Sequence, residues 1–131
     1  MNDNVNFRSF KKGDYEMCCE WWKWWWKRTG LNPVQRALLP DDDKCFIIEK
    51  NGVPIAAYFL LVFEFRVVAF TTYLVTNPKY REKDRRELIK QLVLNVENEA
   101  EKLGVMQLFT ICMNDHMTNI HSSLDWMLIP V

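Results

Sequence analysis

Basic side chains crowd one short stretch of the sequence, and phosphate binding is the chemistry that they suggest. Within twelve residues the stretch carries Lys79, Arg81, Lys83, Arg85, Arg86 and Lys90. Lysine and arginine bind phosphate groups through charge-assisted hydrogen bonds. Three carboxylates are interspersed, those of Glu82, Asp84 and Glu87, so the stretch could also be a solvated helix start whose charges pair with one another. The sequence leaves both interpretations open.

Side chains that could move a proton are few and stand apart from one another. Glu64 separates two apolar runs and could act as a general base, but it is more typical of an exposed charge at a strand end, as is Glu49. His121 could act as an acid or a base, although a single histidine on a short helix is more typical of a structural position. The cysteines lack the spacing of a metal site, so no metal is expected, and Cys18 and Cys112 are predicted to be buried thiols.

Five of the six tryptophans lie in one segment, EWWKWWWKR, at positions 20–28. At roughly 100° per residue, one apolar helix face comprises Tyr15, Cys18, Cys19, Trp22, Trp25 and Trp26, and we expect it to pack on the sheet. A second stripe points away from that face and comprises Met17, Trp21, Trp24 and Arg28. Because exposed indoles at adjoining turns suggest a contact surface, Trp21 and Trp24 are expected to meet a substrate, a protein partner or a second copy in a homodimer. The alternative is that residues 32–39 fold over them.

Length and composition indicate one globular domain. The chain has 131 residues, of which 49% are hydrophobic and 26% charged. Seventeen basic residues balance seventeen acidic ones, so nucleic acid is not an expected partner. No apolar run reaches the roughly 20 residues that a membrane-spanning helix needs, and the N-terminal residues lack a secretion signal. We therefore expect a soluble, cytoplasmic protein that does not bind a membrane.

Hydrophobic periodicity and turn signals predict the elements that position these residues. Residues 5–10 alternate and predict a first strand. Asp14 is placed as the N-cap of a helix over residues 15–29, which Gly30 ends. A short second helix is expected within residues 32–39.

The middle and the end of the chain predict a mixed sheet. Three β-rich runs follow, at residues 44–50, 53–63 and 66–75. Asn51-Gly52, between the first two, is a hairpin signal. A long helix is predicted by the spacing of Leu88, Leu92, Val96, Ala100 and Leu103. A strand at 105–113 and a short helix at 117–127 follow it. The prediction is an α/β fold in which an antiparallel meander leads into a parallel strand–helix–strand crossover.

This order of elements, with the stretch LVTNPKYREKDRRELIKQL from Leu74, resembles the GNAT superfamily of N-acetyltransferases. The resemblance covers nearly all of residues 1–131, mainly as topology, and implies a single GNAT-like domain. It is strongest with short GNAT-like proteins often encoded by tailed phages. These carry tryptophans in the first helix, Leu-Pro before the second strand and Asn-Pro after the fourth, here Trp21 to Trp26, Leu39-Pro40 and Asn77-Pro78.

The resemblance implies an acetyl-CoA site where the fourth and fifth strands separate. Main-chain groups around Leu74 and Val75 would bind the pantetheine arm, which Asn114 would also contact. The family's phosphate loop has the pattern Arg/Gln-x-x-Gly-x-Gly/Ala, and here only Arg81 matches. In the family, the glycines of this pattern let a phosphate approach the amides of a helix start, and this sequence lacks them. The phosphates would therefore depend on basic side chains, those of Arg81, Lys83, Arg85 and Arg86.

A capping box makes the loop still more degenerate. In Asp84-Arg85-Arg86-Glu87 the carboxylate of Asp84 is predicted to accept the amide of Glu87. A carboxylate at that helix start would compete with a phosphate for the same donors.

The family's catalytic groups are weakly matched. Its glutamate on the fourth strand corresponds to Thr72 or Tyr73 here, and its tyrosine on the last helix corresponds to Ser122 or Ser123, next to His121. Two functions follow from the resemblance. One is an N-acetyltransferase that passes acetyl from acetyl-CoA to an amine. The other is a catalytically degenerate GNAT-fold protein that binds a macromolecular partner, such as a host protein bound by a phage protein.

Overall fold

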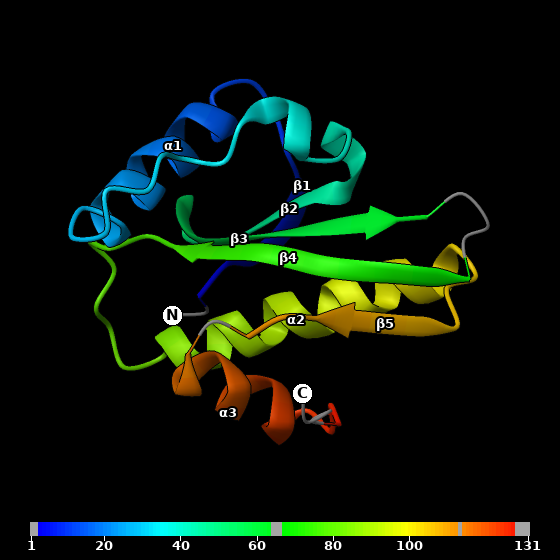
Figure 1. The fold of residues 1–131 in the computed structure, drawn as a ribbon. Helices are drawn as coiled ribbons and strands as arrows, with labels where there is room; N and C mark the ends of the chain where they lie inside the picture. Colours follow the sequence, from blue (N-terminus) through cyan, green and yellow to red (C-terminus); the bar gives the residue numbers. More distant parts are fainter. Residues whose placement is uncertain (1–2, 64–66, 113, 128–131) are drawn as a thin grey trace.

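A five-stranded sheet forms the centre of the protein. The computed structural model describes residues 3–63, 67–112 and 114–127. The strands, in spatial order, are β1 (Val5–Ser9), β2 (Cys45–Lys50), β3 (Val53–Val62), β4 (Val68–Thr76) and β5 (Gln107–Thr110). Neighbours from β1 to β4 pair antiparallel, and β5 pairs with β4 in parallel (Figure 1). The predicted meander and crossover are confirmed.

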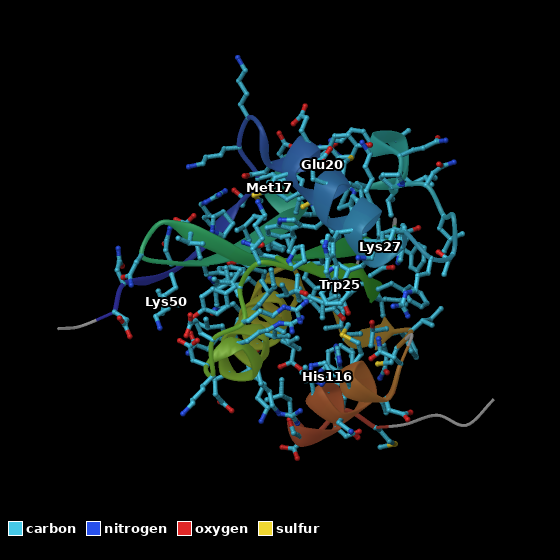
Figure 2. The ribbon with its side chains drawn as sticks, turned by 90° about the vertical axis from the view of Figure 1, so that its left-hand side faces the viewer. Met17, Glu20, Trp25, Lys27, Lys50 and His116 are labelled. Atoms are coloured by element: carbon cyan, nitrogen blue, oxygen red, sulfur yellow. The ribbon has the colours of Figure 1, made fainter. Side chains whose placement is uncertain are left out.

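Helices cover both faces of the sheet. Helix α1 (Asp14–Trp25) lies on one face, and α2 (Arg85–Lys102) and α3 (Asp115–Ser123) lie on the other (Figure 1 and Figure 2). Because side chains alternate along a strand, Phe59 of β3 packs towards α1 while its neighbour Tyr58 packs towards α2. The predicted apolar stripe of α2 is buried, as shown by Leu88, Leu92, Val96 and Ala100. One half of the core therefore lies on each side of the sheet.

The connection after α1 differs from the prediction. Helix α1 ends at Trp25 rather than near residue 29, and residues 32–39 contain only a 3₁₀ turn, Arg36–Leu38, in place of a helix. The segment instead lies along α1. Tyr15 donates its hydroxyl hydrogen to the carbonyl of Val34 (2.9 Å), and Val34 is buried in the α1 cluster. A second 3₁₀ turn, Asp42–Lys44, leads into β2.

This segment corrects the prediction for the tryptophans. Trp22 is 1% exposed and Trp24 is 40% exposed, as predicted. The expected exposure of Trp21 is wrong, because it is 6% exposed in the cluster that includes Val34. The expected burial of Trp25 is also wrong, because this residue ends the helix and is 37% exposed. The alternative that residues 32–39 fold over the outer stripe thus holds for Trp21 but not for Trp24.

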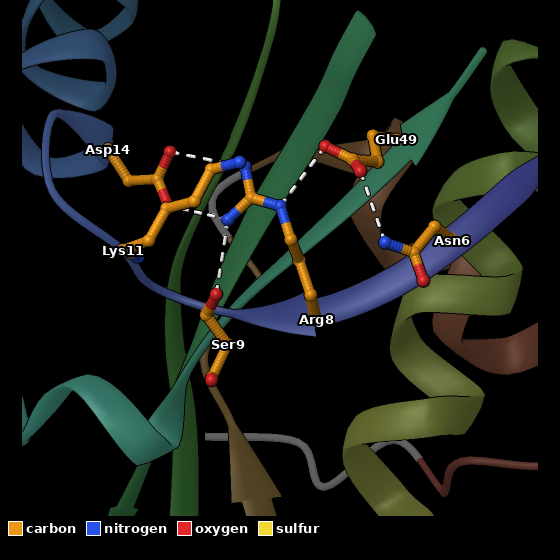
Figure 3. Close-up of polar contacts among 6 residues, drawn as sticks. All are labelled: Asn6, Arg8, Ser9, Lys11, Asp14 and Glu49. Carbon is orange, nitrogen blue, oxygen red and sulfur yellow. Dashed lines mark hydrogen bonds and ion pairs between the residues drawn. The ribbon is translucent and has the colours of Figure 1, made fainter. Parts of the chain in front are cut away.

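Arg8 ties β1 to β2 and to the start of α1 (Figure 3). Its guanidinium donates to both carboxylate oxygens of Asp14 (2.6 and 3.2 Å) and to Glu49 (3.1 Å). Asp14 was expected to cap the helix, but Gly13 takes the N-cap position, at φ 94°, and no side chain caps it. The Asn6 amide and the Arg8 guanidinium hold the pKa of Glu49 below its usual value. The carboxylate of Glu49 is therefore engaged in the contacts that join β1, β2 and the start of α1.

Candidate functional site

The parallel strands β4 and β5 separate halfway along β4. Their pairing runs from Val68↔Gln107 to Thr71↔Thr110 and then stops, although β4 continues to Thr76. A bulge follows at once in β4, because the register with β3 shifts between Ala57 and Phe59. Tyr73, in that bulge, has a φ of 57°, a left-handed conformation that is uncommon outside glycine. β5 ends at Thr110, so the part of β4 beyond the bulge has no described strand paired on its β5 side; we call this unpaired edge of β4 the split.

Main-chain groups of β4 face this split. The amide of Asn77 donates to the carbonyl of Ile55 (2.8 Å), so every second residue of this part of β4 pairs with β3. Val75 is therefore engaged with Ala57, while Leu74 and Thr76 direct their main-chain groups towards the split. The indole nitrogen of Trp25 donates a hydrogen bond to the carbonyl of Thr76 (2.8 Å). Of the two positions that the resemblance implied, Leu74 directs its main-chain groups towards the split, whereas Val75 pairs its main-chain groups with β3.

The start of α2 is not capped by a carboxylate. Asp84 is the N-cap residue, but its side chain makes no capping bond, so the predicted capping box is wrong. The carboxylate turns outward to the ammonium of Lys50 (2.5 Å) and to the hydroxyl of Tyr80. These two groups, Lys50 first, hold the pKa of Asp84 below its usual value. In the described part of the chain, the amides of Arg86 and Glu87 have no hydrogen-bond acceptor.

Arginines surround this helix start. The Arg85 guanidinium donates to the hydroxyl of Thr76 (2.8 Å), and its Nε is buried with no hydrogen-bond partner among the described residues. Arg81 donates from Nε to the carbonyl of Pro78 (2.9 Å). Burial, and then the charge of Arg81, lower the pKa of Arg85. Since no described carboxylate lies within 4 Å of either guanidinium, the start of α2 carries uncompensated positive charge.

The first turn of α3 lies across from these arginines. Burial, followed by the charges of Arg85 and Arg86, lowers the pKa of His116. Figure 2 shows His116 on α3, below Trp25 on the α1 side. His116 is not among the site residues predicted from the sequence, although its place in the first turn after the fifth strand is a usable signal. Asn114, expected at a pantetheine arm, caps α3 by accepting the amide of Met117 (2.9 Å), which leaves its Nδ2 free to donate.

Solved N-acetyltransferases share this arrangement of elements, while no protein-family model and no curated protein matches the chain. N-acetylglutamate synthase from Neisseria gonorrhoeae, complexed with coenzyme A and N-acetyl-glutamate, gives a TM-score of 0.70 at 18% identity, covering 91% of this chain and 28% of that chain. The GCN5-related N-acetyltransferase from Ralstonia eutropha gives 0.67 at 17% identity, covering 98% and 99%. For yncA from Salmonella typhimurium, with its cofactor acetyl-CoA, the values are 0.67, 17%, 96% and 81%.

The chain has the GNAT fold. At these identities the likeness concerns the fold alone, and the chain spans 28% of the length of the synthase. Within this GNAT fold, the split and the uncapped start of α2 form the candidate site.

A buried polar network closes the base of the split in this GNAT fold. Thr71 donates its hydroxyl hydrogen to the Tyr58 oxygen (2.7 Å), and Thr110 donates to the carbonyl of Thr71 (2.9 Å). The Nδ1 atom of His121 faces the carbonyl of Met117 (2.8 Å), which can only accept, so Nε2 accepts the Tyr58 hydroxyl (2.9 Å). Burial raises the pKa of Tyr58 to about 12 and lowers the pKa of His121. Both nitrogens of His121 are therefore engaged.

The remaining catalytic candidates do not converge on one point. Tyr73 is half-buried against the α1 cluster, whereas His121 lies on the α3 side of the sheet. The hydroxyl of Ser123 donates to the carbonyl of Ile120 (2.7 Å). Glu64 lies outside the described residues. The described residues thus give the split a binding surface rather than an evident acid–base pair.

A groove of about 740 Å³ runs along the other side of β5. Its lining comes from β5 with its flanks, the C-terminal half of α2, and α3, and it reaches Thr110 and His121 at the network.

Among the described residues, no helix is long and apolar enough to cross a membrane. Across those same residues, no three His, Cys, Asp or Glu side chains are grouped to hold a metal ion.

Proposed function

We propose that the protein binds acetyl-CoA in the split between β4 and β5 and transfers the acetyl group to an amine. One observation carries the proposal: the open main chain of Leu74 leads directly to a helix start that is uncapped and surrounded by arginines. The amides of Arg86 and Glu87 and the unpartnered Nε of Arg85 are donors that anionic phosphates would satisfy. The solved acetyltransferases of the same fold with coenzyme A or acetyl-CoA support it.

The chain's own groups would act mainly by positioning. The cofactor supplies an acetyl thioester. The main chain of Leu74 would pair with the amides of the pantetheine arm, and the start of α2 would hold the phosphates. An amine arriving from the α1 side, past Tyr73, would then attack the thioester carbon directly. The C–N bond would form as the C–S bond breaks, and the proton lost by the amine would pass through water to the leaving thiolate. Holding the two reactants together is a large part of such catalysis.

A direct binding and turnover experiment tests the proposal. Calorimetric titration with acetyl-CoA is expected to give a dissociation constant between about 1 μM and 1 mM, the usual range for enzyme substrates. With a panel of primary amines, free thiol should then appear only when protein, acetyl-CoA and an accepted amine are all present. Absence of binding at about 1 mM acetyl-CoA would exclude the proposal.

A second candidate is a GNAT-fold protein that binds a macromolecule and transfers nothing. Exposed apolar side chains favour it, since Met106, Ile111 and Met127 are each at least 75% exposed around the β5 groove. Of the surface first expected on α1, only Trp24 and the nearby Arg28 are exposed, which narrows the area for a partner or a second copy. Binding of acetyl-CoA, with no free coenzyme A thiol released in the presence of any amine of the panel, would support this candidate.

Lys50 is expected to affect cofactor binding through Asp84, the N-cap residue of α2, whose carboxylate it contacts. Replacing Lys50 with Met and Tyr80 with Phe removes both partners of the Asp84 carboxylate, which is then free to cap α2. A carboxylate at the helix start should weaken acetyl-CoA binding by about three- to fivefold, measured by calorimetry. Adding Asp84→Ala should restore binding. A double variant that binds as tightly as the wild type would contradict this role.

A further inference from the structure

The two exposed tryptophans at the end of α1 form a platform for two cations, Lys27 just after α1 and Arg81 in the loop before α2. The rings of Trp24 and Trp25 meet edge to face, with centroids 4.8 Å apart. The guanidinium carbon of Arg81 lies 5.4 Å from the Trp24 centroid and 5.6 Å from the Trp25 centroid. The ammonium of Lys27 lies 4.3 Å from the Trp24 centroid. Cation–π contacts of this kind hold a positive charge over a ring.

The platform fixes these cations without neutralising them. Elsewhere in the described chain, cations such as Arg8, Arg36 and Lys50 pair with carboxylates. Lys27 and Arg81 have no carboxylate within 4 Å among the described residues. Arg81 is anchored through Nε to the carbonyl of Pro78, so both of its terminal nitrogens remain available as donors. Because an indole ring carries no charge, the contacts with the rings leave the positive charges of Lys27 and Arg81 in place, and these two side chains still attract an anion.

Trp25 connects the platform to the candidate site. Its indole nitrogen donates to the carbonyl of Thr76, the last residue of β4 (2.8 Å). The guanidinium of Arg85 stacks on the same ring, with 5.5 Å between its carbon and the centroid. The cations on the platform thus adjoin the start of α2, but Lys27 belongs to a different part of the chain from the loop before that helix. The arrangement offers a second anion position beside the first.

We propose that Lys27 and Arg81, held by Trp24 and Trp25, bind the 3′-phosphate of coenzyme A. This inference rests on the proposed function. The pyrophosphate would take the donors at the start of α2, and the 3′-phosphate monoester is the remaining strong anion of the cofactor. A monoester carries nearly two negative charges at neutral pH and is recognised by charge-assisted hydrogen bonds. The protein would accordingly select coenzyme A thioesters over thioesters that lack the 3′-phosphate, with Trp24 acting as a positioning residue.

Paired titrations with acetyl-CoA and acetyl-3′-dephospho-CoA test the proposal. The wild type is expected to bind acetyl-CoA at least about tenfold more tightly than acetyl-3′-dephospho-CoA. Lys27→Met should remove most of that preference while leaving the affinity for the dephospho compound unchanged. Trp24→Leu should reduce the preference in the same way, because Lys27 and Arg81 lose the ring that holds them. Lys12→Met, at an exposed lysine in the turn before α1, is the matched control and should keep the full preference.

Each other outcome counts against a definite statement. A wild type that binds both compounds equally would overturn the 3′-phosphate site and leave the proposed function intact. Equal weakening of both compounds in Lys27→Met, or a similar loss in Lys12→Met, would indicate general electrostatic attraction and would also overturn the site. A wild type that binds neither compound would remove the proposed function and this inference together. Thermal denaturation of each variant, compared with the wild type, identifies any loss of fold.

Discussion

Replacing Arg85 and Arg86 together with methionine is expected to weaken acetyl-CoA binding by about 100-fold or more. Each arginine would contribute a hydrogen bond to a phosphate, and bonds to charged groups are worth about 1.5 to 3 kcal/mol each. Two of them sum to at least about 3 kcal/mol, and each 1.4 kcal/mol is a factor of ten in the dissociation constant. Calorimetric titration of the variant measures the loss directly.

The same variant has a readout that needs no ligand. Burial, and then the charges of Arg85 and Arg86, lower the pKa of His116. Removing both charges should therefore raise the pKa of His116, which a titration followed by NMR would report. An unchanged His116 pKa would contradict the placement of α3 across from the start of α2.

A matched control separates the site from net charge. The double variant Lys12→Met, Lys102→Met also removes two positive charges, from exposed positions away from the split. It is expected to bind acetyl-CoA within about twofold of the wild type, since screened surface charges act weakly at long range. A comparable loss in this control would show that the effect of the arginines is not local. Because Arg85 also contacts Thr76, the melting temperature of each variant belongs in the comparison.

Replacing Trp22 with alanine is expected to cost about 3 to 5 kcal/mol of the free energy of unfolding. Its side chain is 1% exposed, and its ring centroid lies 5.8 Å from that of Phe59 on β3 and 6.1 Å from that of Trp26. Truncation would leave a cavity between α1 and the sheet that the neighbouring rings cannot fill. Chemical denaturation, fitted to a two-state transition, measures the change.

Two companion variants test the reason for that loss. Trp22→Phe should cost less, because the indole nitrogen of Trp22 is buried without a hydrogen-bond partner in the described structure, so no hydrogen bond is lost. Trp24→Ala should cost under about 1 kcal/mol, since this side chain is 40% exposed. If Trp22→Ala cost no more than Trp24→Ala, α1 would not pack on the sheet as described.

The order of the elements was predictable because the signals are local. The apolar spacing of α2 and the alternation of the strands depend only on neighbouring residues. Asn51-Gly52 predicted a hairpin, and both residues adopt positive φ, 52° and 80°, between β2 and β3. The asparagine and the glycine tolerate that conformation wherever they occur, so no tertiary contact was needed to place the turn.

Partners distant in the sequence decided what the sequence predicted wrongly. Asp84 has the spacing of a helix cap, but its carboxylate pairs with Lys50, which is 34 residues away. Trp21 lies on the outer stripe of α1, yet the returning segment at Val34 buries it. Local spacing fixes the direction of a side chain, whereas its partner depends on which distant segment the fold brings there.

The candidate site was likewise only partly predictable from the sequence. The basic stretch around the start of α2 was evident in the sequence, since six cations in twelve residues suggest an anion. The helix start is free of its predicted cap because Asp84 pairs with Lys50 instead. Trp24 and Trp25 hold Arg81 because α1 packs against the end of β4. The sequence determined the order of the elements and the composition of the loop through interactions between near neighbours. The tertiary structure decided which charges remain unpaired, because pairing depends on distances between segments that are remote in the chain.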